Sequence, residues 1–162
     1  MQYTPPVSRL RPAVLAAVLD GPTWIEVLRA GKHEADAMDG DRLRRVEVST
    51  GDLDDMVRTF DRALADNKAG LPVGYNHAAM RGGIAPDETK AAGWMTALKV
   101  DGDRLLALVD WTAEGRDRIR AGEFKYFSVE FVPAEQANAR DGSGKLDAAI
   151  VIGGTLTNQP FI

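Results

Sequence analysis

The amino-acid sequence predicts a β-rich α+β protein, a compact barrel or sandwich of six or seven strands with two helices. Three stretches predict this fold class. Residues 94–111 have the alternation and the Asp-Gly pair of a β-hairpin, and residues 124–132 are rich in aromatic and β-branched side chains, as strands are. Apolar side chains between residues 53 and 64 recur instead at helical spacing.

The composition excludes several classes of function. The chain has 162 residues, a net charge of −4, two histidines and no cysteine. Disulfides, a thiol nucleophile and cysteine or histidine-rich metal sites are therefore not expected. No basic block and no run of about 18 apolar residues occurs, so neither nucleic acid nor a membrane is an expected partner. Gly82-Gly83 does not follow the strand–helix pattern of a phosphate loop, so no cofactor is expected.

The chain length suits one core, and we expect a single domain over residues 13–162. Residues 1–12 contain three prolines and are expected to form a flexible arm. Residues 23–28 have the composition of a strand, residues 30–41 are polar and contain glycine as a loop would, and residues 46–48 are expected to form a short strand.

The first helix is predicted to begin after residue 48. Ser49 or Thr50 can cap it, because a side-chain oxygen there accepts a hydrogen bond from a free N–H of the first turn. The helix is expected to end within residues 67–70 and to pack on the sheet through one apolar stripe. The stripe consists of Leu53, Met56, Val57, Phe60 and Leu64.

The central part of the chain is predicted to form three strands. Residues 71–77 are expected to form a strand that ends at or near its histidine, and residues 78–90 a flexible loop. A hairpin then joins residues 94–100 to residues 103–111. Its turn is predicted at Asp101-Gly102, since this pair suits a tight turn with positive φ.

A second helix and two strands are predicted for the rest of the chain. Thr112 can cap the helix and Gly122 can terminate it. The strand of residues 124–132 follows, then a polar loop over residues 134–145 and a last strand over residues 148–156.

Three further side chains are placed by the same reasoning. Trp94 and Trp111 could line a groove, yet packing in the core is the expected role for both. His33 lies in a polar stretch and is expected at the surface.

Ser128 is the candidate nucleophile. Side chains alternate along a strand, so Tyr126, Ser128 and Glu130 share one face of theirs. A small hydroxyl between larger side chains fills a core poorly, but it suits a nucleophile that is held on a rigid element. Such a hydroxyl needs a base within hydrogen-bond reach, and His77 is the candidate because the unperturbed pKa of histidine is about 6.5. A partly exposed serine without a catalytic role is the alternative interpretation.

Several short motifs occur in a characteristic order along most of the chain. They are Trp24-Ile25, Ala30-Gly31, Leu71-Pro72-Val73, Tyr75-Asn76-His77, Ala91-Ala92-Gly93-Trp94, Asp110-Trp111-Thr112, the stretch from Ile119 to Gly122, Tyr126-Phe127-Ser128 and Leu156-Thr157-Asn158-Gln159-Pro160. Through these motifs, the segment from about residue 24 to residue 162 resembles the protease of Mu-like phages and prophages, a prohead maturation protease and scaffold precursor. That family is similar in turn to the prohead proteases of other tailed phages and to the herpesvirus assembly proteases.

The resemblance implies a compact barrel of mainly antiparallel strands flanked by helices, in which Ser128 is the nucleophile and His77 the general base. Family members often carry an acidic residue just before the histidine and a proline after the serine, whereas this chain has Gly74, Asn76 and Val129. Related proteases can also place an acid on the last strand, where this chain has none. The third catalytic member therefore stays open among three candidates, which are Glu130, Asp110 and Asn158.

The resemblance further implies a serine endopeptidase of capsid maturation. Such an enzyme would act in the host cytoplasm, inside the assembling prohead, and cleave the scaffold, itself and the major capsid protein. A homo-oligomer such as a dimer is implied by the herpesvirus relatives. The alternative is a catalytically inactive scaffold or assembly module with the same fold, and the altered neighbours of His77 and Ser128 motivate it.

Overall fold

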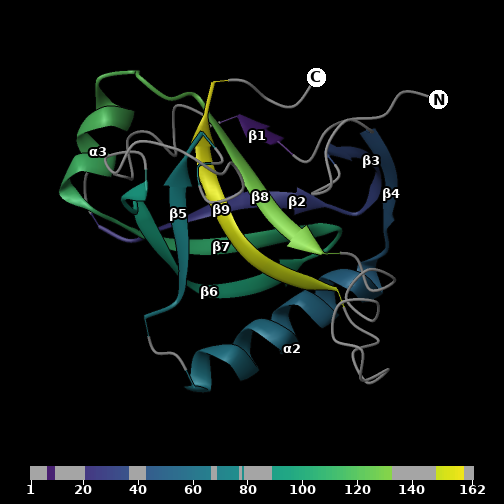
Figure 1. Cartoon of the computed structure of the whole chain (residues 1–162). Helices are drawn as coiled ribbons and strands as arrows, with labels where there is room; N and C mark the ends of the chain where they lie inside the picture. The colour runs from purple at the N-terminus through teal and green to yellow at the C-terminus, as the bar shows by residue number, and fades with distance from the viewer. Residues whose placement is uncertain are drawn as a thin grey trace.

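The computed structural model shows a curled sheet with two helices, as Figure 1 shows. The structure describes residues 7–9, 21–36, 43–66, 69–76, 78, 89–132 and 149–158. The strands are β1 (Val7–Arg9), β2 (Thr23–Arg29), β3 (Gly31–Asp36), β4 (Leu43–Val48), β5 (Leu71–Tyr75), β6 (Gly93–Asp101), β7 (Arg104–Trp111), β8 (Tyr126–Val132) and β9 (Ile150–Thr157). The helices are α2 (Thr50–Asp66) and α3 (Ala113–Arg120).

Seven strands form one sheet in the order β1-β8-β9-β5-β6-β7-β2, and β3 and β4 form a separate hairpin. Neighbouring strands of the large sheet are antiparallel except β5 and β9, which are parallel. The edge strands β1 and β2 contact each other, and β2 also contacts β8, so the sheet curls into a nearly closed barrel. The predicted β-rich α+β barrel is confirmed.

The interior of the barrel holds the hydrophobic core. Along β7 every second side chain is buried, and these residues are Leu105, Ala107, Val109 and Trp111. This confirms the apolar face that alternation predicts, because side chains of a strand point to opposite faces in turn.

Ser49 caps α2. Its Oγ accepts a hydrogen bond from the N–H of Asp52 at 3.0 Å, and the carboxylate of Asp52 accepts one from the N–H of Ser49 at 2.8 Å. The reciprocal pair satisfies two N–H groups that the helix cannot pair by itself. Of the two predicted caps, Ser49 is therefore the one that the chain uses.

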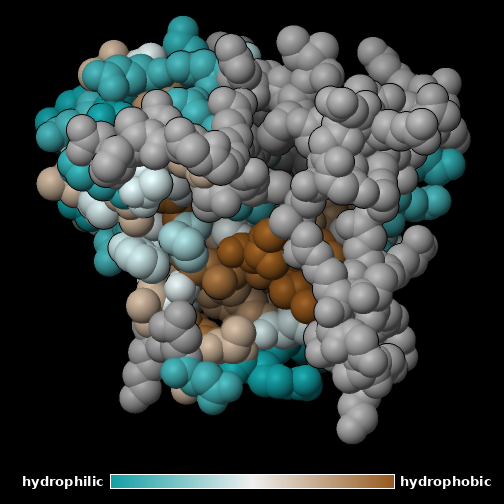
Figure 2. Space-filling model, viewed as in Figure 1, coloured by the Kyte–Doolittle hydropathy of each residue, from teal (hydrophilic) through white to brown (hydrophobic). Residues whose placement is uncertain are grey.

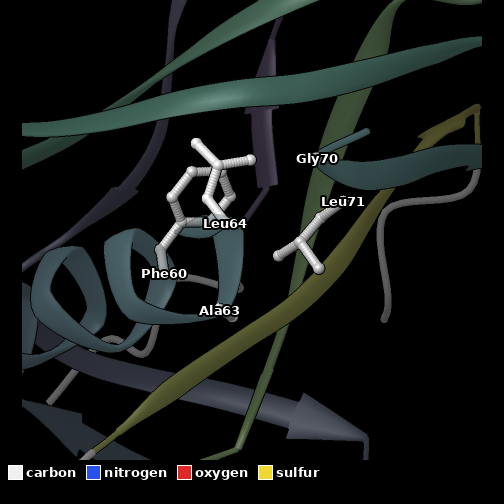
Figure 3. A pocket seen from close by; sticks show the side chains of 5 residues that line it. All are labelled: Phe60, Ala63, Leu64, Gly70 and Leu71. Atoms are coloured by element: carbon white, nitrogen blue, oxygen red, sulfur yellow. The ribbon is translucent and has the colours of Figure 1, made fainter. Parts of the chain in front are cut away.

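The apolar stripe of α2 packs on the sheet, where the helix contacts β6 and β9. The buried residues of the stripe are Leu53, Met56 and Phe60. Val57 and Leu64 are partly buried and pack against the core. Figure 3 shows Phe60 and Leu64 close together, with Leu71 of β5 beside them, around a cavity of about 30 Å³. The predicted packing of this helix is confirmed.

The hairpin of β6 and β7 is confirmed, but its turn lies one residue further along than predicted. Asp101 pairs with Arg104, so the two central residues of the turn are Gly102 and Asp103. Gly102 has a φ of +62°, and Asp103 is not in the positive-φ region. Positive φ at the first central residue is the conformation of a type II′ turn, which requires glycine there.

The second helix is as predicted at both ends. The hydroxyl of Thr112 accepts a hydrogen bond from the N–H of Gly115 at 3.0 Å and donates one to the carbonyl of Ala92 at 2.9 Å. Gly122, with a φ of +74°, follows the helix. Gly115 faces the same Ala92 carbonyl so closely that a Cβ at this position would clash with it. The hydroxyl of Thr112 therefore both caps α3 and binds its first turn to Ala92, the residue before β6.

The loop predicted over residues 30–41 is wrong, because Gly31–Asp36 forms β3 and pairs with β4. The surface position predicted for His33 is also wrong. His33 is only 6% exposed, and its Nε2 donates a hydrogen bond to the carbonyl of Arg29 at 2.6 Å. The polar segment forms a strand because the backbone of β4 pairs with it. The composition of the segment alone does not indicate that partner.

Within the stretch expected as a flexible arm, residues Val7–Arg9 form β1. Val7 lies opposite Ser128, and Arg9 lies opposite Tyr126. This short strand covers the edge of β8, whose backbone groups would otherwise lack a partner on that side. The loops expected over residues 78–90 and 134–145 lie outside the described residues, except for Ala78, Thr89 and Lys90.

Candidate active site

Ser128 lies within β8, on the face of the strand that is turned away from the core. Its neighbours Phe127 and Val129 belong to the core cluster, as the predicted alternation requires. Ser128 itself is only 1% exposed. It is therefore buried, and not the partly exposed serine of the alternative interpretation.

Ser128 stands in one row with two residues of the neighbouring strands. It is paired with Thr155 of β9, and Thr155 is paired with Gly74 of β5. Thr155 is fully buried, and Gly74 has open space where a side chain would begin. Since paired strands are about 4.8 Å apart, the backbones of Ser128 and Gly74 are roughly 10 Å apart. Side chains projecting from these two strands on the same face can therefore meet above Thr155.

The C-terminal end of β5 leads directly to His77, which itself lies outside the described residues. Asn76, the residue before it, has a φ of +50° and donates its N–H to the carbonyl of Leu156 at 2.9 Å. Leu156 is in turn paired with Phe127 of β8. The described chain thus remains paired with β9 up to the residue before His77, and the approach of His77 to Ser128 stays a prediction.

The two acidic candidates for a third catalytic member lie in different places. Glu130 shares the face of Ser128 on β8 and is partly buried. Asp110 is exposed on β7, four strands away from β8 in the sheet order, and forms an ion pair with Arg116 at 3.7 Å. The structure brings Glu130 to the neighbourhood of Ser128 and leaves Asp110 outside it.

Asn158, the third candidate, connects the end of β9 to the segment before β8. Its Oδ1 accepts a hydrogen bond from the N–H of Lys125 at 3.0 Å, and its Nδ2 donates one to the carbonyl of Glu123. Both ends of the amide are therefore bound to backbone groups. The observed contacts of Asn158 position the start of the nucleophile's strand.

A groove of about 340 Å³ lies on the face of the sheet that carries Ser128. Residues from four strands line it, among them Pro72, Gly74, Trp94, Glu130, Ile152 and Thr155. Figure 2 shows the face of the molecule that is turned to the viewer in Figure 1, with an apolar patch and a hollow near its middle. Two neighbours of Ser128, namely Thr155 across the strands and Glu130 along β8, thus belong to the wall of a groove.

The prediction that both tryptophans lie in the core is right for Trp111 and wrong for Trp94. Trp111 is buried, whereas Trp94 is 37% exposed and lines the groove. A bulge between Met95 and Ala97 shifts the register of β6 by one residue, so that Trp94 lies opposite Asp110. A one-residue shift moves a side chain to the other face of a sheet, and no sequence signal marks this bulge.

Tyr75 joins the end of β5 to α3. Its ring lies 5.4 Å from that of Phe124, and the guanidinium of Arg118 lies 4.6 Å from its ring centroid. Its hydroxyl is buried and has no hydrogen-bond partner in the part of the chain that the structure describes. Burial raises the pKa of Tyr75 above its usual value, the Glu114 carboxylate raises it further, and Arg118 partly opposes the rise.

Replacing Tyr75 with phenylalanine should leave the free energy of unfolding at pH 7 unchanged or raise it by up to about 1 kcal/mol, because an unpaired hydroxyl leaves the interior. Above pH 10 the folded wild type keeps a proton that the unfolded chain releases, so its stability falls as the pH rises through the raised pKa. The Tyr75→Phe variant should lack this part of the alkaline loss. Urea denaturation at pH 7 and pH 11 measures both effects, with Tyr126→Phe as the control. A loss above about 1 kcal/mol at pH 7 would contradict the prediction.

The described residues lack two structural features. Among them, no group of three or more histidine, cysteine, aspartate or glutamate side chains is placed to hold a metal ion. No helix in these segments is long and apolar enough to cross a membrane.

The sequence does not indicate Thr155 as a residue of the site, and for Trp94 it favours the core over the alternative of a groove position. Thr155 was not expected beside Ser128, because the residue opposite a serine depends on the register between β8 and β9. Thr155 also carries no acidic group, so a pattern that places an acid on the last strand does not mark it. The position of Trp94 depends on the bulge in β6, so only a sequence signal for that bulge would place this residue at the groove.

A comparison with family models identifies one match over residues 25–162, the N-terminal domain of the Mu-like prophage I protein. Searches of the curated proteins and of the solved structures give no match.

Proposed function

Because the chain belongs to the family of the Mu-like prophage I protein, through its N-terminal domain, we propose that this phage protein is a serine endopeptidase of prohead maturation. The observation that carries the proposal is the row of Ser128, Thr155 and Gly74 on one face of the sheet. The nucleophile's strand and the strand that leads to His77 both flank β9, and a groove opens beside them.

The proposed reaction is an acyl transfer to Ser128. The side chain of His77 takes the proton of the Ser128 hydroxyl while the Oγ attacks the carbonyl carbon of the scissile peptide bond. His77 then gives this proton to the leaving amine, and the acyl group stays on Ser128. Water then attacks the ester carbonyl while His77 takes its proton, and His77 gives this proton to the Oγ of Ser128 as the acyl–oxygen bond breaks and the acid product leaves.

Among the candidates for a third member, Glu130 is the one that we propose, because it shares the face of Ser128 and lines the groove. In this role it would orient His77 and stabilise its protonated form. The ion pair of Asp110 and the backbone contacts of Asn158 give these two residues other tasks.

The proposed substrates are the phage scaffold protein, the protease itself and the major capsid protein, and the proposed place of action is the assembling prohead in the host cytoplasm. A dimer is part of the same proposal, through the resemblance to herpesvirus assembly proteases.

The inactive scaffold or assembly module is the second candidate function. The near-complete burial of Ser128 favours it, and so does β1, which runs along the same strand with Val7 opposite the serine. A serine that acts on a polypeptide has to be reached by a carbonyl carbon, so under this alternative Ser128 would never be accessible.

The test combines labelling and cleavage. A fluorophosphonate probe should modify wild-type protein at Ser128, as shown by mass spectrometry of the labelled peptide. Wild-type protein should also process the scaffold protein of the same phage, whereas Ser128→Ala should not. Ser49→Ala serves as the matched control, because it removes a hydroxyl from the cap of α2. Processing by a folded Ser128→Ala variant would end the protease proposal, and wild type that is neither labelled nor active would favour the inactive module.

A further inference from the structure

The groove beside Ser128 has a size and position that bear on substrate choice. Its volume of about 340 Å³ is at the small end of the range of about 300–1,000 Å³ for ligand pockets. It holds one or two side chains, and it is too small for a folded element. An extended polypeptide passing Ser128 could therefore place a side chain in it.

The floor of the groove is open because of Gly74. A Cβ added to this residue would meet nothing within 4 Å, and its φ is not in the left-handed region. Glycine is therefore not required there by the backbone or by packing. A larger side chain at position 74 would instead enter the groove, on the face shared with Thr155 and Ser128.

Trp94 is the aromatic residue among the described residues that line the groove. Trp94 is paired with Pro72, which lies two residues before Gly74 on the same face. A large apolar side chain with 37% of its surface exposed is well suited to cover an apolar group of a ligand. Ile152 adds a second apolar surface.

The charges at the groove are balanced. Glu130 and Lys90 contribute one carboxylate and one ammonium group to the lining. A lining without net charge does not select a charged side chain, and the apolar surfaces of Trp94 and Ile152 favour an uncharged, hydrophobic one.

We infer that this groove is the pocket for a large apolar side chain of the substrate polypeptide next to the bond that is cleaved, and that Trp94 and Gly74 determine its specificity. Trp94 supplies the contact surface, and the missing side chain of Gly74 supplies the room. The inference rests on the proposed peptidase function of Ser128.

The experiment compares cleavage of one peptide library by four proteins: wild type, Gly74→Leu, Trp94→Ala and Trp24→Ala. Trp24 is the matched control, because it is 38% exposed on β2 and does not line the groove. Mass spectrometry of the products gives the residues around each cleaved bond, and kcat/KM is then measured on single peptides. Thermal unfolding shows whether each variant folds. The milder variants Gly74→Ala and Trp94→Phe replace any variant that does not.

Wild type should require a large apolar residue at one fixed position relative to the cleaved bond. Gly74→Leu should shift the preference at that position to glycine, alanine or serine, and Trp94→Ala should lower kcat/KM for the large apolar residue by about tenfold or more. Trp24→Ala should stay within about twofold of wild type. In the Ser128→Ala background, a peptide with this residue should change the tryptophan fluorescence, and the change should vanish with Trp94→Phe but persist with Trp24→Phe.

The two proposals fail in different ways. An active peptidase whose preference is the same in wild type, Gly74→Leu and Trp94→Ala would overturn the inference about the groove and leave the peptidase standing. A wild type that cleaves no peptide and is not labelled at Ser128 would overturn the peptidase, and the substrate pocket with it.

Discussion

Replacing either Ser128 or His77 with alanine is expected to lower the rate of scaffold cleavage by about 10,000-fold or more, and replacing both should lower it no further. The two side chains act in one step, so the loss of either removes the same acyl transfer and the effects are not additive. Single-turnover cleavage of the scaffold by the two single variants and the double variant measures this. If the cleavage rate of the double variant falls by the product of the two single-variant factors, the two residues act independently and the prediction is wrong.

The same variants separate the candidates for the third member. Glu130→Gln should lower the rate less than His77→Ala does, because a residue that orients a base contributes less than the base itself. Asp110→Asn is the matched control, since Asp110 is exposed, forms an ion pair with Arg116 and does not line the groove. A loss in Asp110→Asn equal to that in Glu130→Gln would contradict the assignment of Glu130.

The pH dependence of kcat/KM gives a second check of His77. An imidazole that accepts the serine proton has to be neutral, so the rate should fall as the pH drops below the pKa of this histidine, which is about 6.5 when unperturbed. His33 is the other histidine of the chain, and His33→Gln therefore serves as the control, which should keep the acidic limb of the profile.

Replacing Phe60 with alanine should lower the free energy of unfolding by about 3–5 kcal/mol. Phe60 is buried in the middle of the α2 stripe, and it borders a cavity of about 30 Å³ that its removal would enlarge. The surrounding strands β6 and β9 are inner strands of the nearly closed barrel and have little freedom to move inward. Urea denaturation followed by circular dichroism measures the change.

Arg62→Ala is the control for Phe60, because Arg62 is exposed on the same helix and its replacement should change the stability by no more than about 0.5 kcal/mol. A loss below about 1 kcal/mol in Phe60→Ala would show that α2 is peripheral to the core.

The parts of the fold that the sequence predicts correctly depend on local interactions. The cap of α2 at Ser49 and the cap of α3 at Thr112 need only a side chain and the N–H groups of the next turn. The pairing of β6 with β7 follows from a glycine at the turn between them, although the alternation does not settle which two residues are central. In each case the partner lies within a few positions in the chain.

The parts that it does not predict depend on distant partners. The polar strand β3 forms because β4 pairs with it, and β1 forms because β8 offers an edge. In the site, alternation gives the face of Ser128, but the register with β9 decides that Thr155 is its neighbour. The bulge in β6 likewise decides that Trp94 borders the groove. Register is a property of two strands, so neither strand's sequence contains it alone.

The strand β1 is an edge strand of the barrel, and its residues precede the part of the chain that the family model matches. Residues Val7–Arg9 lie before the matched region 25–162, yet they cover β8 on the side away from β9 and contact β2. A fragment cut at the start of the match would leave the backbone of the nucleophile's strand unpaired on that side. An unpaired strand edge can pair with a strand of another molecule, so the family match and the paired sheet begin at different residues of this chain.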